Sequence, residues 1–322
     1  MKNILVTGGA GFIGSHLVER LATGGDKEIV VLDNLSCGHK ENIPVASNVS
    51  FVQGDIRDEG LVDRLARNCD TIFHLAEYIP ETKKYGPGHV IKFSSENPLE
   101  DFDVNTRGTL IVLEAARRYH RKVIFTSTAA VYGKTNLKHV SEDYVKLPVS
   151  PYGASKYCSE TYVSLYHRAF GVPGAIARFF NVYGPRQSKY VMYDLLLKLS
   201  SNPKRLEVLG NGKESRDFVY VQDAVDALLL IATDPKAEGQ VFNVGTGKAT
   251  SILEVVKMLK QILQMDTEIQ VMGKSWPGDL RTITSNISKL KSLGYEPKVS
   301  VEEGLKKLAA WFLESTPSIS SQ

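Results

Sequence analysis

The chain has 322 residues, of which 43% are hydrophobic and 23% are charged. This balance is typical of a soluble globular protein that buries a sizeable core, in one large domain or two. The formal net charge of +3 is small and evenly spread, and no apolar run approaches the roughly 20 residues that span a bilayer. We therefore expect neither nucleic acid nor a membrane as a partner.

The three cysteines, Cys37, Cys69 and Cys158, are odd in number and match no metal-binding spacing. The N-terminus begins a hydrophobic strand at once and has no secretory signal layout. We therefore expect reduced thiols, no metal and a cytoplasmic protein.

The first half alternates short apolar runs with helical patterns, which predicts a parallel sheet flanked by helices. The predicted strands are Asn3–Val6, Ile29–Leu32, Val49–Val52, Thr71–His74, Lys122–Thr126 and Gly174–Arg178. The predicted helices lie near Gly11–Ala22, Glu59–Arg67, Pro98–Tyr119 and Pro151–Phe170. After about Asn181, glycines and prolines mark loops, and strand Val241–Val244 and helix Asp223–Ala232 are expected to return to the first sheet. Helices near Ile252–Leu263 and Val301–Leu313 are expected in a smaller C-terminal part.

We therefore predict an α/β protein, a Rossmann-type doubly wound parallel sheet with a smaller C-terminal α/β substrate-binding domain. Residues 1–180 and about 216–247 are assigned to the first domain, and residues 181–215 and 248–315 to the second. Residues 316–322 are polar and are expected to form a frayed tail.

A glycine-rich turn follows the first strand, with Gly8, Gly11 and Gly14 leading into a helix. Glycine permits a tight turn and a close approach to a pyrophosphate, and the helix N-terminus offers free N–H groups to it. Asp33 ends the next strand, where a carboxylate accepts hydrogen bonds from an adenosine ribose and repels a 2′-phosphate. This arrangement predicts a dinucleotide site for NAD rather than NADP. Asp55 and Ile56 follow the third strand, where the adenine is expected, although Asp55 alone would fit a helix N-cap.

Tyr152 and Lys156 lie four residues apart after Pro151, which places both side chains on one face of a predicted helix. A nearby ammonium and a positive nicotinamide would favour the phenolate, which could then take a proton from a sugar hydroxyl. The pair alone is weak evidence, because a tyrosine with lysine four positions on occurs by chance. Ser127 and Thr128 give it context, because they follow a strand at the carboxyl edge of the sheet, where such sheets bind ligands.

Several motifs together resemble the extended short-chain dehydrogenase/reductase family, in its nucleotide-sugar epimerase and dehydratase branch. The matching segments are Thr7–Gly14, His74–Ala76, Asn105–Gly108, Ser127–Gly133, Tyr152–Lys156, Arg178–Pro185 and Arg216–Asp223, with a weaker match at Trp276–Arg281. The resemblance is specific for the branch and not for the substrate. It also implies a homodimer, in which the helices near Pro98–Tyr119 and Pro151–Phe170 form an intermolecular four-helix bundle.

The resemblance implies a role for each matching residue. The catalytic group would be Thr128, Tyr152 and Lys156, with Thr128 bonding the reacting sugar oxygen and Lys156 holding the nicotinamide ribose. The implied cofactor contacts are Gly8, Gly11, Phe12, Ile13, Gly14, Asp33, Asn34, Asp55, Ile56, Leu75, Ala76, Asn105, Tyr152 and Lys156. The implied substrate contacts are Thr128, Tyr152, Asn181, Arg216, Asp279 and Arg281.

Some of these residues also have a purely structural interpretation. Asn181 could cap a turn, and Arg216 could pair with Asp217, although a guanidinium suits phosphate well. Asn105 lies within a helical pattern, where bonds to backbone or water are more typical than bonds to substrate. His74 ends a buried strand and is expected to be structural.

Three reactions share this scaffold: 4-epimerisation, 4,6-dehydration and decarboxylation. Relatives that dehydrate carry Asp-Glu directly after the Ser/Thr of this strand end, and decarboxylases carry a Glu one position further along. Here Ala129 and Ala130 occupy these positions, and a methyl group cannot transfer a proton. We therefore expect 4-epimerisation of a UDP-hexose, such as UDP-glucose or UDP-galactose, through a 4-keto intermediate.

One departure from the family pattern concerns the segment after Ala76. Glu77 stands where the family usually has a second alanine, and the loop Tyr78–Asn97 is longer than usual, with Lys83, Lys84, His89 and Lys92. It could be a surface insertion, or it could alter sugar recognition towards a charged or N-acetylated hexose. Dehydration, decarboxylation, reduction, or epimerisation of a UDP-uronate or UDP-N-acetylhexosamine remain the alternatives. A non-enzymatic NAD-sensing protein is a further alternative, but such proteins tend to lose the tyrosine or the lysine.

Overall fold

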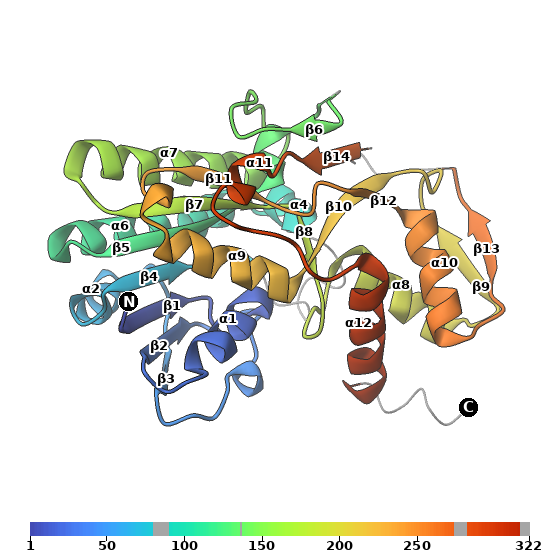
Figure 1. Cartoon of the computed structure of the whole chain (residues 1–322), viewed down its shortest axis with the longest axis horizontal. Coiled ribbons are helices and arrows are strands. Elements are labelled where there is room, and N and C mark those ends of the chain that lie inside the picture. Colours follow the sequence, from blue (N-terminus) through green and yellow to red (C-terminus); the bar gives the residue numbers. More distant parts are fainter. Residues whose placement is uncertain (80–89, 136, 274–281, 316–322) are drawn as a thin grey trace.

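The computed structural model describes residues 1–79, 90–135, 137–273 and 282–315. A seven-stranded parallel sheet in the order β11-β7-β5-β4-β1-β2-β3 forms its larger part (Figure 1). The strands are β1 (Asn3–Thr7), β2 (Glu28–Asp33), β3 (Val49–Gln53), β4 (Thr71–His74), β5 (Lys122–Thr128), β7 (Gly174–Phe179) and β11 (Val241–Val244). Every strand expected in this sheet is present, within two residues of its expected ends.

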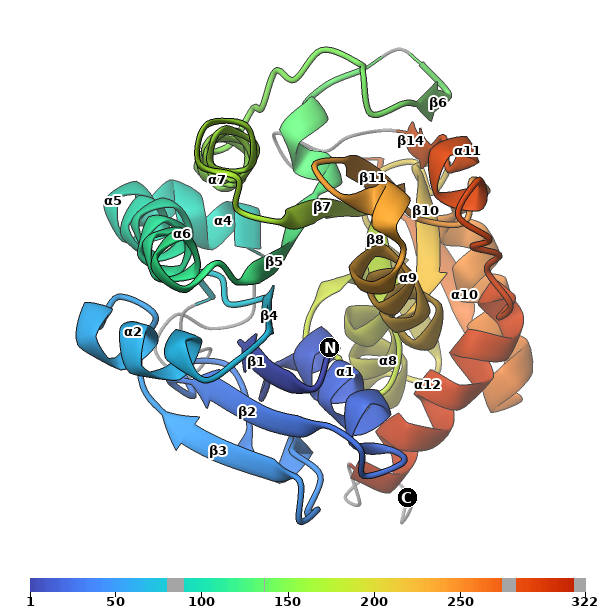
Figure 2. The same ribbon diagram turned by 60° about the vertical axis from the view of Figure 1, so that its left-hand side comes forward.

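Helices cover both faces of the sheet, as Figure 2 shows. On one face α1 (Phe12–Ala22) packs against α9 (Val221–Thr233), and on the other α2 (Glu59–Arg67), α6 (Gly108–Tyr119) and α7 (Pro151–Phe170) lie side by side. The sheet is therefore buried on both faces, and the prediction of a Rossmann-type α/β fold is confirmed.

The first strand shows how the sequence produces this layering. Ile4 and Val6 belong to the hydrophobic core under α1 and α9, whereas Leu5 belongs to the core under α2, α6 and α7. Successive side chains of a strand point to opposite faces, so an unbroken apolar run fills both cores at once.

A second group of elements is built from short strands and helices (Figure 1). Its larger sheet joins β12 (Ala249–Ser251), β10 (Ser215–Tyr220), β14 (Thr282–Ser285) and β6 (His139–Val140), with β8 (Asn181–Tyr183) paired to β10. A two-stranded sheet joins β13 (Glu268–Val271) and β9 (Arg205–Val208). Helices α8 (Tyr190–Ser201), α10 (Ile252–Leu263) and α12 (Val301–Ser315) share a hydrophobic core. A capping box between Ser251 and Glu254 starts α10.

The segment expected as one helix over Pro98–Tyr119 is helical but not uniform. It consists of α5 (Pro98–Phe102), a π-helical turn (Asp103–Arg107) and α6. Just before it lies α4 (Val90–Glu96), a helix within the long loop after β4 that the sequence did not predict. Short helical turns at Lys40–Asn42, Ala129–Tyr132 and Pro235–Ala237, and α11 (Ser288–Lys291), complete the described elements.

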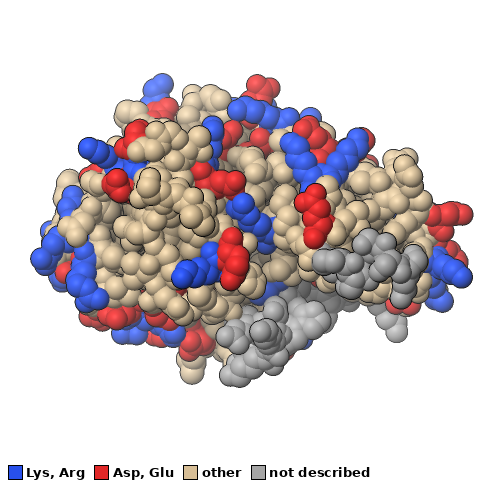
Figure 3. All heavy atoms as spheres, turned by 90° about the horizontal axis from the view of Figure 1, so that it is seen from below, with Lys and Arg blue, Asp and Glu red and all other residues tan. Residues whose placement is uncertain are grey.

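Acidic and basic side chains are interspersed on the face of the molecule shown in Figure 3. None of the helices within the described ranges has the length and apolarity needed to cross a bilayer. Within the same ranges, no group of three or more His, Cys, Asp or Glu side chains is placed to hold a metal ion.

Candidate active site

A cavity of about 740 Å³ opens at the carboxyl ends of the central strands. One end is lined by the glycine turn after β1, the middle by the end of β5 and the start of α7, and the other end by β8 and β10. This volume is within the range of pockets that hold cofactors and substrates. The position is where open α/β sheets bind ligands.

The glycine turn accepts no larger residue at two positions. Gly8 has a φ of +70°, and a Cβ there would lie 2.7 Å from the Ala76 nitrogen. A Cβ on Gly14 would lie 2.2 Å from the Gly8 carbonyl oxygen. Helix α1 begins directly after Gly11, whose position lacks a side-chain cap, so its first N–H groups stay available to a phosphate. Phe12 and Ile13 line the same end of the cavity.

The expected adenosine contacts also line the cavity. The Asp33 carboxylate accepts hydrogen bonds from the Ala10 and Leu35 backbone N–H groups at 3.0 and 2.8 Å, and burial raises its pKa. A hydrogen-bonded ion pair with Arg57 lowers the pKa of Asp55 to about 2, and Asn34 donates to the same carboxylate. Ile56, Leu75 and Ala76 complete this wall.

Thr128 and Tyr152 meet where β5 ends and α7 begins. The Thr128 hydroxyl accepts a hydrogen bond from the Ala130 N–H and caps a 3₁₀ turn. Helix α7 starts at Pro151 because the Ser150 hydroxyl accepts a bond from the Gly153 N–H. Tyr152 is therefore fixed in the first turn, and both Thr128 and Tyr152 line the cavity.

Glu77 lies between the expected catalytic tyrosine and lysine. The Tyr152 hydroxyl donates to Glu77 Oε2 at 2.9 Å, and Lys156 Nζ lies 3.8 Å from the same oxygen. Burial and the Glu77 carboxylate raise the pKa of Tyr152 well above its ordinary value. In the protein alone, the phenol is therefore held protonated. The expectation that Lys156 and a positive nicotinamide together favour its ionisation concerns the cofactor-bound enzyme and stays a prediction.

Lys156 is almost completely buried one turn further along α7 and, unlike Tyr152, is not among the residues that line the cavity. Its ammonium lies 4.6 Å from the centre of the Phe125 ring. Burial lowers its pKa, while the carboxylates of Glu77 and Asp101 oppose this effect.

Asn105 joins three segments around this centre. Its amide oxygen accepts from the Tyr78 N–H at 2.8 Å, and its amide nitrogen donates to Asp101 and Ser155 at 3.0 and 3.1 Å. It does not line the cavity. These contacts position the start of the long loop, and a direct contact of Asn105 with the cofactor stays a prediction.

His74 has partners at both ring nitrogens, Thr7 and Thr109, and is fully buried. Burial and the charge of Lys156 lower its pKa to about 3. It is therefore a neutral side chain that fastens β4 to β1 and α6, as expected of a structural residue.

Four substrate contacts were expected besides Thr128 and Tyr152, and the structure describes two of them. Asn181 and Arg216 both line the far end of the cavity. The neighbouring Asp217 points to the other side of β10, where its carboxylate accepts bonds from Thr246, Gly247 and Ser285. The hydrogen-bond partners of the Asp217 carboxylate therefore lie on the side of β10 that faces away from the cavity. Asp279 and Arg281 lie outside the described residues, as do Lys83, Lys84 and His89 of the long loop.

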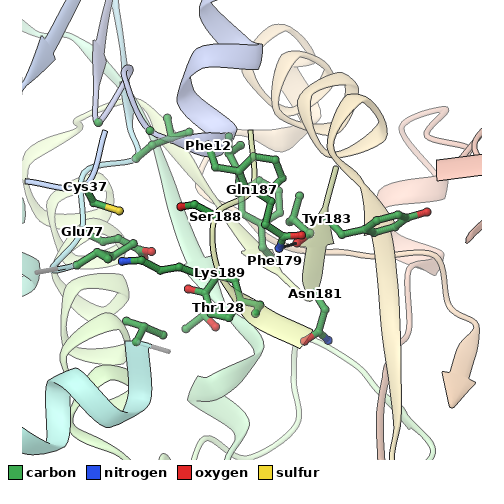
Figure 4. A pocket seen from close by; sticks show the side chains of 18 of the residues that line it. Phe12, Cys37, Glu77, Thr128, Phe179, Asn181, Tyr183, Gln187, Ser188 and Lys189 are labelled. Atoms are coloured by element: carbon green, nitrogen blue, oxygen red, sulfur yellow. Dashed lines mark hydrogen bonds between the residues drawn. The ribbon is translucent and has the colours of Figure 1, made fainter. Parts of the chain in front are cut away.

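Two cavity residues were missed as candidates. The Ser127 hydroxyl and the Lys189 ammonium are both buried, and neither has a hydrogen-bond partner among the described residues. The Lys189 ammonium lies 5.4 Å from the centre of the Phe93 ring on α4. Figure 4 shows Lys189 and Glu77 extending into the same part of the pocket, with Thr128 nearby in this view. Ser127 could have been selected from its place at the strand end. Nothing in the local sequence marks Lys189.

Comparison with known proteins agrees with this geometry. Residues 4–245 match the model of the NAD dependent epimerase/dehydratase family. The UDP-glucose 4-epimerase of Mycolicibacterium smegmatis is 36% identical over 96% of this chain and 97% of its own length. The structure of Thermotoga maritima UDP-glucose 4-epimerase with UDP-glucose superposes with a TM-score of 0.87, at 35% identity over 97% of this chain and 99% of that one. The structure of Methanobrevibacter ruminantium UDP-N-acetylglucosamine 4-epimerase with UDP-N-acetylmuramic acid superposes with a TM-score of 0.89. The two chains are 30% identical over 98% of this chain and 99% of that one.

The fold and site define an enzyme of the Rossmann type with NAD as its cofactor. The chain belongs to the NAD-dependent epimerase/dehydratase family. Similar relatives also include a UDP-N-acetyl-alpha-D-glucosaminuronate decarboxylase of Bacillus cytotoxicus and a dTDP-D-glucose 4,6-dehydratase of mouse. Membership therefore defines the class of enzyme and leaves the reaction to be argued from the residues.

Proposed function

We propose that the chain is an NAD-dependent 4-epimerase of a UDP-hexose, of the UDP-glucose/UDP-galactose type. The observation that carries this proposal is the pair Ala129 and Ala130 beside Thr128. Both alanines line the cavity, at the positions where dehydratases and decarboxylases of this branch carry acidic side chains. Epimerisation needs no additional acid or base there, because its two hydride transfers occur at the same carbon.

The proposed mechanism uses the residues around β5 and α7. Bound NAD supplies the acceptor and donor of the C4 hydride. Tyr152 takes the proton of the sugar 4-hydroxyl and returns it after the keto sugar has turned over, while Thr128 bonds the same oxygen. Lys156 holds the nicotinamide ribose, and Arg216 and Asn181 keep the nucleotide diphosphate in place during the turnover. We further propose a homodimer formed through α7 and the helical segment from α5 to α6.

Lys189 favours a second candidate substrate, a UDP-hexuronate. A buried ammonium without a hydrogen-bond partner is costly, so an anionic ligand group that approaches it would be strongly favoured. A sugar carboxylate would supply that group. The reaction would be the same 4-epimerisation, because this substrate differs only at C6.

The test is incubation of the purified enzyme with a panel of UDP-hexoses, UDP-N-acetylhexosamines and UDP-hexuronates, with products resolved by NMR and mass spectrometry. We expect a C4 epimer of unchanged mass. Tyr152→Phe should lower kcat by at least about a hundredfold, since general acid–base catalysis contributes about 10²–10⁴, and should leave NAD binding intact.

Loss of water or of carbon dioxide would replace the proposal with dehydration or decarboxylation. Full activity of Tyr152→Phe would refute the assigned proton transfer. As a control we choose Tyr119→Phe, because Tyr119 also donates to a carboxylate, Asp63, but lies outside the cavity.

A further inference from the structure

Glu77 places a carboxylate in direct contact with the reacting phenol. It follows β4 by three residues and lines the cavity, and its side chain is about one quarter exposed. Its Oε2 accepts the Tyr152 proton at 2.9 Å and lies 3.8 Å from Lys156 Nζ. The backbone N–H of Tyr78, the residue after Glu77, donates a hydrogen bond to the Asn105 amide oxygen. The carboxylate is therefore both placed beside the phenol and anchored by its backbone.

This contact changes what the phenol can do. The phenol keeps its proton but donates it in a hydrogen bond to the Glu77 carboxylate. The lone pairs of the phenol oxygen are therefore free to accept a hydrogen bond, and then a proton, from the substrate hydroxyl. Burial and Glu77 together raise the pKa of Tyr152, which makes a free phenolate costly at neutral pH. If Tyr152 transfers its own proton to Glu77 while it receives the proton of the substrate hydroxyl, no free phenolate is formed.

Other charged or titratable groups surround Glu77 and Tyr152. They are Lys156 on α7, Asp101 on α5, Tyr190 and Lys189 at the start of α8, and His74 at the end of β4. Among the residues that the structure describes, Lys156 is the cation within ion-pair distance of the carboxylate.

We infer that Glu77 is the terminal acceptor of the substrate proton, so that Tyr152 acts as a relay between the sugar hydroxyl and this carboxylate. The inference rests on the proposed 4-epimerisation. As the C4 hydride leaves, the 4-hydroxyl proton moves to Tyr152 Oη and the original phenol proton moves to Glu77 Oε2. Both protons move back when hydride returns to the keto carbon, so the enzyme ends each cycle unchanged.

Glu77→Gln removes the acceptor while keeping the shape of the side chain. We expect kcat at pH 7 to fall by at least about tenfold, because the phenol must then ionise by itself. In the wild type, kcat should fall with acidification as a carboxylate is protonated. In Glu77→Gln, kcat should instead rise with pH into the alkaline range, towards the ionisation of tyrosine. Glu77→Asp keeps a carboxylate and should regain part of the rate and the acidic limb of the profile.

Two further measurements separate a relay from a merely structural contact. Solvent isotope effects in H₂O–D₂O mixtures should curve for the wild type, as two protons move together, and should be linear for Glu77→Gln. Tyrosinate absorbance of the ligand-free protein should show Tyr152 ionising at lower pH in Glu77→Gln, after subtraction of the matching Tyr152→Phe proteins. Asp63→Asn is the matched control, because Asp63 accepts from the Tyr119 hydroxyl outside the cavity.

An unchanged kcat and acidic limb in Glu77→Gln would overturn the relay, while an active, Tyr152-dependent wild type would leave the proposed function intact. An equal tyrosinate titration in the two proteins would also overturn it. If no C4 epimer forms from any substrate, the proposed function fails, and the absorbance titration still decides whether Glu77 controls the phenol. Thermal melting and NAD content of each variant exclude misfolding as the cause of a lost rate.

Discussion

Asp33 is the residue that we propose to select between NAD and NADP. Its carboxylate is already oriented by two backbone N–H groups, so it meets an adenosine ribose without rearrangement. The same charge would repel a phosphate on that ribose. We therefore propose that selectivity for NAD depends on the negative charge of Asp33 at the end of β2.

We predict that Asp33→Asn weakens NAD binding and narrows the preference for NAD over NADP. Loss of a hydrogen bond to a charged group costs about 1.5–3 kcal/mol, or roughly a tenfold to hundredfold rise in Kd. Calorimetric titration with both cofactors measures the change. Asp70→Asn is the control, because Asp70 also accepts two backbone N–H bonds, from Lys2 and Asn3, but lies outside the cavity. A variant that kept the full preference for NAD would show that another residue selects the cofactor.

The place of Glu77 in the site could be predicted only in part from the sequence. Its departure from the family pattern was visible in the sequence, but its contact with Tyr152 was not. The two residues are 75 positions apart, and only the packing of α7 beside the end of β4 brings them together. The same holds for Lys189, whose ammonium lies 5.4 Å from the centre of the ring of Phe93, on a helix that the sequence did not predict.

The inner strands of the central sheet were predictable because they are largely apolar on both faces. β1 supplies both hydrophobic cores, so its pattern is an unbroken apolar run that no loop would carry. The short strands β8 and β12 have three residues each and partly exposed side chains, so they leave little periodicity. Tertiary pairing with β10 defines them instead.

The π-helical turn between α5 and α6 is an element whose function is positional. It turns Asn105 towards Tyr78, Asp101 and Ser155, and so connects the loop that carries Glu77 to α7. Such irregular turns are frequent at functional sites.

We predict that Asn105→Ala lowers both stability and kcat. The lost bonds leave buried polar partners unsatisfied, at a cost of about 1–3 kcal/mol in the free energy of unfolding, and the segment after Glu77 loses its anchor. Urea unfolding and kcat with the identified substrate measure the two effects. The control is Asn48→Ala, a buried asparagine that donates to the Ala22 and Lys27 carbonyls outside the cavity and should lose stability alone. An unchanged kcat in Asn105→Ala would separate Asn105 from the catalytic centre.

At the scale of the whole molecule, apolar side chains remain exposed on the helices proposed to form the dimer. Leu165 and Phe170 on α7, and Leu99 and Phe102 on α5, are 41–84% exposed. Helices α5 and α7 pack against one another, so these side chains belong to neighbouring elements. A partner subunit covering them would remove this apolar area from water.

We predict that the wild type has twice the mass of the 35.6-kDa chain in solution, and that Leu165→Arg shifts it towards a monomer. A charge in the centre of an apolar interface is destabilising because it is desolvated without a partner. Light scattering after size-exclusion chromatography measures the mass. Leu313→Arg, at an exposed position on α12, should remain dimeric. A monomeric wild type would exclude the proposed assembly.

The cavity has walls from both the central sheet and the smaller sheet around β10, and this links occupancy to the integrity of the whole chain. A ligand that touches both walls binds only when the two parts are folded and apposed. At a concentration of one hundred times its Kd, such a ligand stabilises the folded form by about 2.7 kcal/mol. In a cell, the enzyme would thus be better protected from proteolysis when the concentrations of its cofactor and nucleotide-sugar substrate are higher.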